Sequence, residues 1–204
     1  MTRVVLATRN AHKVIELRRI LTAAGLDVDL VGMDAYPHVP EVPETGATFE
    51  DNALLKARAV ARATGEIALA NDSGLAVNAL NGMPGVLSAR WAGRPGSDSD
   101  EANLRLVLAQ IADVPDQRLG AWFECAAAAV FPDDREFVVR GRLAGSITRI
   151  PRGSNGFGYD PIFIPAGGDR TTAELGDDEK DAISHRGVAF RALAAQLQGL
   201  IEPR

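Results

Sequence analysis

The stretch that decides the fold is Arg3-Val4-Val5-Leu6-Ala7-Thr8-Arg9-Asn10-Ala11-His12-Lys13. Its apolar first half predicts a short buried strand, which ends near Ala7. The residues after it have helical spacing, with one apolar stripe made of Val14, Leu17, Leu21 and Ala24. Gly25 ends this helix and Val28 to Val31 predict a second strand. Strand, helix and strand in succession are typical of a sheet flanked by helices.

The next segment repeats that alternation. Thr48 is placed to cap a second helix, which Gly65 closes. Its inward-facing residues are Phe49, Ala53, Ala57, Val60 and Ala61. Residues 67–70 predict a buried strand, which ends in Asn71-Asp72-Ser73-Gly74. Residues 32–47 and 81–98 are rich in Gly and Pro, so we expect loops there.

The second half predicts a helix, a hairpin and a final helix. Residues 99–111 present Leu104, Val107, Leu108 and Ile111 on one helix face. Two long strands, 119–131 and 136–149, are joined by Pro132-Asp133-Asp134. The last helix, near 185–201, follows Ser184 as its cap and carries Phe190, Leu193, Leu197 and Leu200 on one face. We expect an α/β fold: a single domain over residues 1–204, with an elongated mixed sheet flanked by helices and two lobes joined by the long strands.

Composition excludes several classes of protein. About half of the residues are apolar, at 46%, which is enough for a packed core. The single cysteine, Cys125, cannot form a disulfide within the chain, and three scattered histidines argue against a structural zinc site. A net charge of -5 argues against a general nucleic-acid binder. No apolar run approaches a membrane span and no signal peptide is seen, so we expect a cytoplasmic protein without membrane partners.

The motif Thr8-x-Asn10-x-x-Lys13 lies where a strand turns into a helix. Backbone N–H groups and the positive end of the helix dipole favour phosphate there, and Lys13 adds a charge. The alternative is an Asn10 cap followed by a solvated lysine. It is not a P-loop, because the Gly-x4-Gly-Lys pattern is absent.

Asp72 follows a buried strand, at the edge where ligands of open α/β sheets gather. A carboxylate there can hold Mg²⁺ or orient water, whereas the alternative is a plain turn. Ser73 is adjacent to Asp72 in sequence and no Gly-x-Ser-x-Gly elbow is present, which disfavours a Ser–His–Asp hydrolase. Lys56 and Glu44 on their own are typical of a surface lysine and a loop carboxylate.

Two further clusters carry chemistry. The loop from Gly153 to Pro161 contains three glycines around Phe157, which can stack on a base; the alternative is aromatics packed into the core. Lys180 and Ser184-His185-Arg186 form the other cluster. Cations in a helix's first turn oppose its dipole, so His185 and Arg186 are interpreted as donors to a ligand, against two solvated side chains as the alternative.

These clusters in their order resemble the inosine triphosphate pyrophosphatase family, also called dITP/XTP pyrophosphatases, over nearly the whole chain. The matching segments are Ala7 to Lys13, Glu44-Thr45-Gly46, Asn52 to Ala57, Asp72 to Leu75, Pro84-Gly85, Gly156 to Pro161 and Ser184 to Gly187. The resemblance implies hydrolysis of inosine, deoxyinosine and xanthosine triphosphates to the monophosphate and pyrophosphate, which removes deaminated purines from the nucleotide pool. It also implies a central nucleotide cleft between two lobes and a homodimer.

The resemblance further implies roles for individual residues. Asp72 is the catalytic carboxylate, and Asp72 and Glu44 hold Mg²⁺. The implied substrate-binding residues are Thr8, Arg9, Asn10, Ala11, His12, Lys13, Lys56, Ser73, Phe157, Gly158, Tyr159, Asp160, Lys180, His185 and Arg186. His185 and Arg186 facing position six of the purine favour a carbonyl over the amino group of adenine.

One residue departs from the family pattern. Many relatives have Asp-Asp-Ser-Gly, whereas this chain has Asn71 before Asp72, which removes one negative charge from the expected metal site. That substitution leaves open a regulatory module that binds a purine nucleotide without hydrolysing it. A pyrophosphatase for modified pyrimidine nucleotides, of the Maf type, is a related enzyme that the Ser184-His185-Arg186 cluster disfavours. A protein-interaction domain has little support, because no long exposed apolar stripe is evident.

Overall fold

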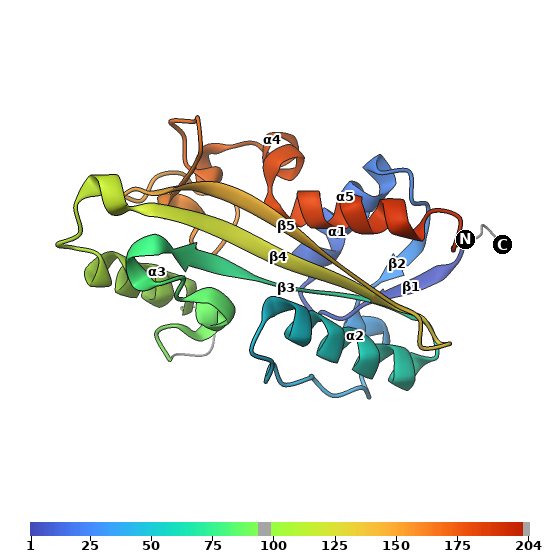
Figure 1. Cartoon of the computed structure of the whole chain (residues 1–204). Helices are drawn as coiled ribbons and strands as arrows, with labels where there is room; N and C mark the ends of the chain where they lie inside the picture. The colour runs from blue at the N-terminus through green and yellow to red at the C-terminus, as the bar shows by residue number, and fades with distance from the viewer. Residues whose placement is uncertain (94–98, 202–204) are drawn as a thin grey trace. The chain divides into compact units, whose positions relative to one another are not determined.

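Figure 1 shows the computed structural model of the chain, in which residues 1–93 and 99–201 are described. The strands are β1 (Arg3–Leu6), β2 (Asp29–Val31), β3 (Ile67–Val77), β4 (Gly120–Val130), β5 (Glu136–Ile147) and β6 (Phe163–Pro165). The α-helices are α1 (Ala11–Ala23), α2 (Phe49–Thr64), α3 (Ser99–Gln110), α4 (Asp177–Ile183) and α5 (His185–Leu197). None of the described helices is long and apolar enough to cross a membrane.

The strands form one sheet in the order β2-β1-β3-β4-β5-β6. β1 pairs in parallel with β2 and with β3, whereas β5 and β6 are antiparallel. Parallel pairing at one end follows from the α1 crossover between β1 and β2. The expected mixed sheet with flanking helices is therefore confirmed.

The chain divides into two compact units, each with its own apolar core. Unit 1 comprises Met1–Asp72, Cys125–Gly141 and Arg186–Arg204. Its core is built from β1, α1, β4 and α5 and includes Leu6, Leu17, Leu21, Phe190 and Leu193. Within this unit, α2 covers the opposite side of the strands from α1 and α5 (Figure 1).

Unit 2 comprises Ser73–Glu124 and Arg142–His185. Its core packs the α3 face against strand residues and includes Leu75, Leu104, Val107, Phe123 and Phe163. The sequence pattern predicted this apolar face of α3. The expectation of a single domain with two lobes stays a prediction.

Several predicted signals are confirmed at the local level. Thr48 caps α2 in a reciprocal arrangement with Asp51: the Thr48 hydroxyl accepts from the Asp51 N–H at 3.1 Å, and the Asp51 carboxylate accepts from the Thr48 N–H at 3.1 Å. Gly65 takes a positive φ of 70° after the helix. The hairpin between β4 and β5 turns at Asp134, whose φ is also positive.

The alternative of a plain turn at Asp72-Ser73-Gly74 is wrong, because β3 does not end near residue 70 but continues to Val77. Gly74 is not a turn glycine. A Cβ there would lie 2.3 Å from the Ser88 hydroxyl and 2.4 Å from the Gly85 carbonyl oxygen, so glycine permits close packing along the strand. The polar residues therefore lie within a strand, which fixes the face that each one takes.

Three other expectations need correction. The segment 81–98 is not all loop, because Gly85–Arg90 forms a 3-10 helix, and residues 94–98 of that prediction lie outside the described residues. The last helix ends at Leu197, so Leu200 is 39% exposed instead of buried. Helix α4 was not predicted, because it has seven residues and no apolar stripe. Ser184 ends α4 and directly precedes α5.

Candidate functional site

Unit 1 contains a group of polar side chains, the carboxylate–lysine cluster, made of the buried Asn52 and Asp72 and the partly buried Glu44 and Lys56. Lys56 comes from α2, Glu44 from the loop before it, and Asp72 from β3. The Lys56 ammonium lies 2.6 Å from Glu44 Oε1 and 3.9 Å from Asp72 Oδ1. The Lys56 side chain is only 14% exposed, so the interpretation as a surface lysine is wrong. The structure brings together two carboxylates that the sequence separates by 28 positions.

Asn52 joins this cluster to the loop that carries Glu44. Its Nδ2 donates to Asp72 Oδ2 at 2.9 Å, and its Oδ1 accepts from the Gly46 N–H at 2.7 Å. Asn52 is fully buried. Sequence reasoning counted it in a motif but gave it no role. The available signal was its position four residues before Lys56, which places both on one face of α2.

Lys13, in the first turn of α1, belongs to the same electrostatic environment. Its pKa is lowered to about 8, first by burial and then by the charges of Arg186 and Lys56; Glu44 and Asp72 act in the opposite direction. The alternative of a solvated Lys13 is therefore wrong, because the residue is partly buried. A lysine whose charge is disfavoured by burial and by two neighbouring cations suits an anionic ligand.

The helix start around Lys13 is only in part the open phosphate cradle that we expected. Asn10 is the N-cap, and its side-chain oxygen accepts from the His12 N–H at 3.0 Å and the Lys13 N–H at 3.3 Å. The Thr8 hydroxyl accepts from the Asn10 N–H at 3.2 Å. These N–H groups are therefore engaged within the chain. The side chains of Ala11 and His12 are exposed.

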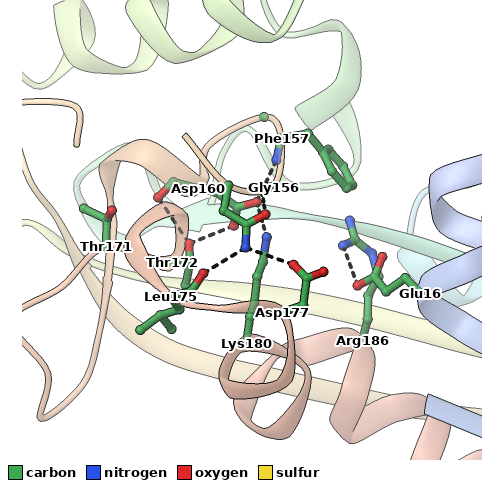
Figure 2. A network of polar contacts seen from close by, with 12 residues as sticks. Glu16, Gly156, Phe157, Asp160, Thr171, Thr172, Leu175, Asp177, Lys180 and Arg186 are labelled. Carbon is green, nitrogen blue, oxygen red and sulfur yellow. Dashed lines mark hydrogen bonds and ion pairs between the residues drawn. The ribbon is translucent and has the colours of Figure 1, made fainter. Parts of the chain in front are cut away.

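Two predicted binding residues of unit 1, Arg9 and Arg186, have defined partners. The Arg9 guanidinium donates to the carbonyls of Met33 at 3.2 Å and Val39 at 2.7 Å, which anchors the loop after β2. Arg186, in the first turn of α5, is 6% exposed and pairs with Glu16 of α1 at 3.4 Å (Figure 2). Burial of Arg186 contradicts the alternative of a solvated side chain.

Unit 2 contains a second buried ion pair, which organises the glycine-rich loop (Figure 2). Asp160 Oδ2 accepts from the Lys180 ammonium at 2.6 Å and from the Phe157 N–H at 2.9 Å. Asp160 Oδ1 accepts from the Thr172 hydroxyl at 2.7 Å. Gly156 has φ +80°, and a Cβ on it would lie 2.2 Å from both Asp160 Oδ2 and Lys180 Nζ. Asp160 and Lys180 therefore hold the loop in shape.

The two aromatic residues of that loop have different environments. Phe157 is 40% exposed, so the alternative of core packing is wrong for it. Tyr159 is buried and its hydroxyl donates to the Ser88 carbonyl at 2.9 Å. Burial, followed by the charge of Asp100, raises the pKa of Tyr159. Between them, the Gly158 N–H donates to Asp100 at 2.9 Å. Phe157 alone offers an aromatic face to solvent, and Tyr159 is part of the packing.

His185, also in unit 2, is 5% exposed and stacks on Phe123, with ring centroids 4.8 Å apart and an interplanar angle of 12°. The alternative of a solvated histidine is wrong. Ser73 lies on β3 and is partly buried.

In unit 1, Asn71 lies beside the thiol of Cys125, and burial raises the pKa of that thiol to about 12. Asn71 is thus a core neighbour of a neutral thiol.

The metal-binding capacity of the described residues is limited to few ligands. No group of three or more His, Cys, Asp or Glu side chains in that part of the chain could hold an ion. Glu44 and Asp72, however, both face the Lys56 ammonium group. The space between these two carboxylates therefore already accommodates a positive charge. Magnesium is commonly bound by one or two carboxylates together with water and substrate phosphates. The donor set of the cluster fits that mode.

Comparison with known proteins gives one consistent family. The model of the Ham1 family matches residues 4–196. A protein of Streptomyces coelicolor named dITP/XTP pyrophosphatase is 61% identical over 201 residues, which cover 98% of this chain and 100% of that protein. A protein of the same name from Mycobacteroides abscessus is 56% identical, over 98% of this chain and 96% of that one.

Solved structures agree in fold. A nucleoside-triphosphatase / dITP/XTP pyrophosphatase from Mycobacterium abscessus has a TM-score of 0.77 at 58% identity, over 96% of this chain and 99% of that chain. A HAM1 protein from Coxiella burnetii has a TM-score of 0.87 at 41% identity, over 98% and 100% of the two chains.

Proposed function

We propose that this chain, which belongs to the Ham1 family, hydrolyses dITP, XTP and ITP to the nucleoside monophosphate and pyrophosphate. The names of its relatives support the reaction and two of the substrates, dITP and XTP. The observation that carries the proposal is that Lys56 lies between Glu44 and Asp72, with Lys13 in the same electrostatic environment. A triphosphate has several negative charges, so its hydrolysis needs cations that neutralise the phosphates. It also needs carboxylates that hold a metal ion and orient water.

In this proposal the unit 1 cluster binds the phosphates. The ammonium groups of Lys13 and Lys56 neutralise phosphate oxygens, and Thr8 and the amide of Asn10 add donors beside Lys13. Glu44 and Asp72 would hold a divalent cation, which we propose to be Mg²⁺. When bound, such an ion supplies charge neutralisation at the phosphates. Lys56 would then exchange its carboxylate partner for phosphate.

The bond changes can be assigned to named atoms. A water oxygen attacks the α-phosphorus while its proton passes to Asp72 Oδ1, because Oδ2 already accepts from Asn52. The bond between the α-phosphorus and the bridging oxygen breaks, and the electron pair leaves with pyrophosphate. Lys13, which burial and Arg186 disfavour in its charged form, gains most from the charge on the leaving group.

We propose, as the family resemblance implies, that Phe157, His185 and Arg186 recognise the base. The exposed ring of Phe157 offers a stacking surface, and His185 and Arg186 supply donors for a carbonyl at position six of the purine. Asp160 and Lys180 act by holding the loop. The direct substrate contacts expected of Arg9, Ala11, His12, Ser73, Gly158 and Tyr159 stay predictions.

The test is turnover of a nucleotide panel in ¹⁸O-labelled water, with Mg²⁺ and with a chelator. We expect dITP, XTP and ITP to give monophosphate carrying the label and unlabelled pyrophosphate, and ATP, which has an amino group at position six, to react far more slowly. Label in pyrophosphate, or release of orthophosphate, would refute attack at the α-phosphorus. Binding of a purine nucleotide without turnover would favour the regulatory module, and preference for modified pyrimidines would favour the Maf type.

We also propose a cytoplasmic homodimer, as the family resemblance implies. The chain mass is 21.6 kDa, so light scattering after gel filtration should give about twice that value for a dimer. A monomer at micromolar concentration would refute this part of the proposal without affecting the chemistry.

A further inference from the structure

Asn52 stands out because both ends of its amide are engaged by different parts of the carboxylate–lysine cluster. Its donor end reaches Asp72 Oδ2 at 2.9 Å, and its acceptor end takes the Gly46 N–H at 2.7 Å. Gly46 lies two residues after Glu44. One buried side chain thus ties the strand that carries Asp72 to the loop that carries Glu44.

We propose that Asn52 is a positioning residue that sets the two carboxylates for the metal and the attacking water. This inference rests on the proposed function and deepens it. The amide fixes Asp72 by its Oδ2, which directs Oδ1 toward the side where Lys56 lies at 3.9 Å. The same amide fixes the backbone at Gly46 and so limits where Glu44 can be placed.

The packing around Gly46 supports a tether instead of a chance contact. A Cβ on Gly46 would lie 2.5 Å from the Asp51 Cβ and 2.8 Å from Asn52 Oδ1. The loop backbone therefore approaches the start of α2 as closely as glycine permits. Asn52 is fully buried there, so no water competes for either end of its amide.

Polarity explains why an asparagine suits this position. The contact with Asp72 needs a donor and the contact with Gly46 needs an acceptor, and a terminal amide supplies one of each. Aspartate would keep the acceptor but face Asp72 with a like charge. Alanine would remove both contacts, and leave a buried carboxylate oxygen and a buried N–H without them.

The matched control is Asn103, in α3. It is also a buried helical asparagine, 1% exposed, whose Oδ1 accepts a backbone N–H, that of Ala92, at 2.7 Å. Substituting it perturbs a similar packing environment without touching the cluster. Comparison of Asn52→Ala and Asn52→Asp with Asn103→Ala and Asn103→Asp therefore separates positioning from general loss of stability.

We expect Asn52→Ala to lower kcat for dITP by about 100-fold, because small misplacement of a reacting group has effects of that size. KM should change by less than about threefold, since Lys13 and the base contacts remain. Mn²⁺ binding to the full-length, nucleotide-free chain, followed by electron paramagnetic resonance, should weaken by about tenfold. Asn52→Asp should also lose kcat, while both Asn103 variants keep kcat and Mn²⁺ affinity.

Several results would overturn the assignment: unchanged kcat and Mn²⁺ affinity in Asn52→Ala, equal losses in Asn103→Ala, or no Mn²⁺ binding by the wild-type chain. The Mn²⁺ measurement uses no substrate, so it judges the role of Asn52 even if the proposed function fails. A wild-type chain that binds Mn²⁺ but hydrolyses none of dITP, XTP and ITP would refute the function alone.

Discussion

Substrate binding should weaken between pH 7 and pH 9 because of Lys13. With a pKa of about 8, Lys13 in the free chain is about 90% charged at pH 7 and about 10% charged at pH 9. If a phosphate group binds only the ammonium form, KM for ITP rises by about tenfold across this interval. The direction follows from the sign of the shift: burial and neighbouring cations lower the pKa, and an anionic ligand raises it again.

The control is Lys13→Arg, because a guanidinium stays charged throughout this range. The substrate and the metal titrate identically in both proteins, so the difference between their KM profiles belongs to Lys13. Calorimetry in two buffers of different ionisation enthalpy should also show uptake of about 0.9 proton on binding at pH 9 in the wild-type chain, and almost none in Lys13→Arg. Parallel KM profiles, with equal proton uptake, would show that Lys13 does not bind the phosphates.

Three further predictions concern single residues. Asp72→Asn should lower kcat for ITP by about 10³-fold or more with an unchanged circular dichroism spectrum, since the proton acceptor is lost; a rate near wild type would remove Asp72 from the mechanism. Arg186→Ala should lower the ratio of kcat/KM for ITP over ATP by at least about tenfold, and an unchanged ratio would place purine recognition elsewhere. Gly156→Ala should lower Tm and raise KM more than Gly158→Ala does, because both positions have positive φ but only the Cβ at Gly156 meets Asp160 and Lys180, at 2.2 Å; equal effects would mean that backbone strain alone is responsible.

The sequence predicted the regular elements well where one physical signal dominates. The capped, amphipathic α2 and the hairpin at Asp134 could be read from Thr48, Gly65 and the turn residues. The stretch Asn71 to Gly74 misled because Asn, Asp, Ser and Gly favour turns locally, whereas here they lie in a buried strand. Tertiary packing, such as that of Gly74 on Ser88, is not visible in local propensity.

The residues of the site could be predicted from the sequence, but the role of each residue could not. Motif order brought Glu44, Lys56 and Asp72 into one hypothesis, and the structure brings them together. Asn52 was given no role because its position four residues before Lys56 shows only that the two share a helix face. Its role depends on two contacts, with Asp72 and Gly46, that only coordinates reveal.

Two lysine–aspartate pairs among the described residues have the same residue types but different distances, and the distances separate a structural role from a chemical one. Asp160 is held by Lys180 at 2.6 Å, and its other oxygen accepts from the Thr172 hydroxyl, so both carboxylate oxygens are engaged in contacts that hold the loop. Lys56 instead makes its short contact with Glu44, at 2.6 Å, and stays 3.9 Å from Asp72. By drawing Lys56 away, Glu44 keeps a close ammonium from competing for Asp72 Oδ1. In the proposed mechanism Glu44 therefore helps to keep Asp72 Oδ1 available as the proton acceptor before any metal binds. Glu44→Gln should then impair proton transfer to Asp72 as well as metal binding.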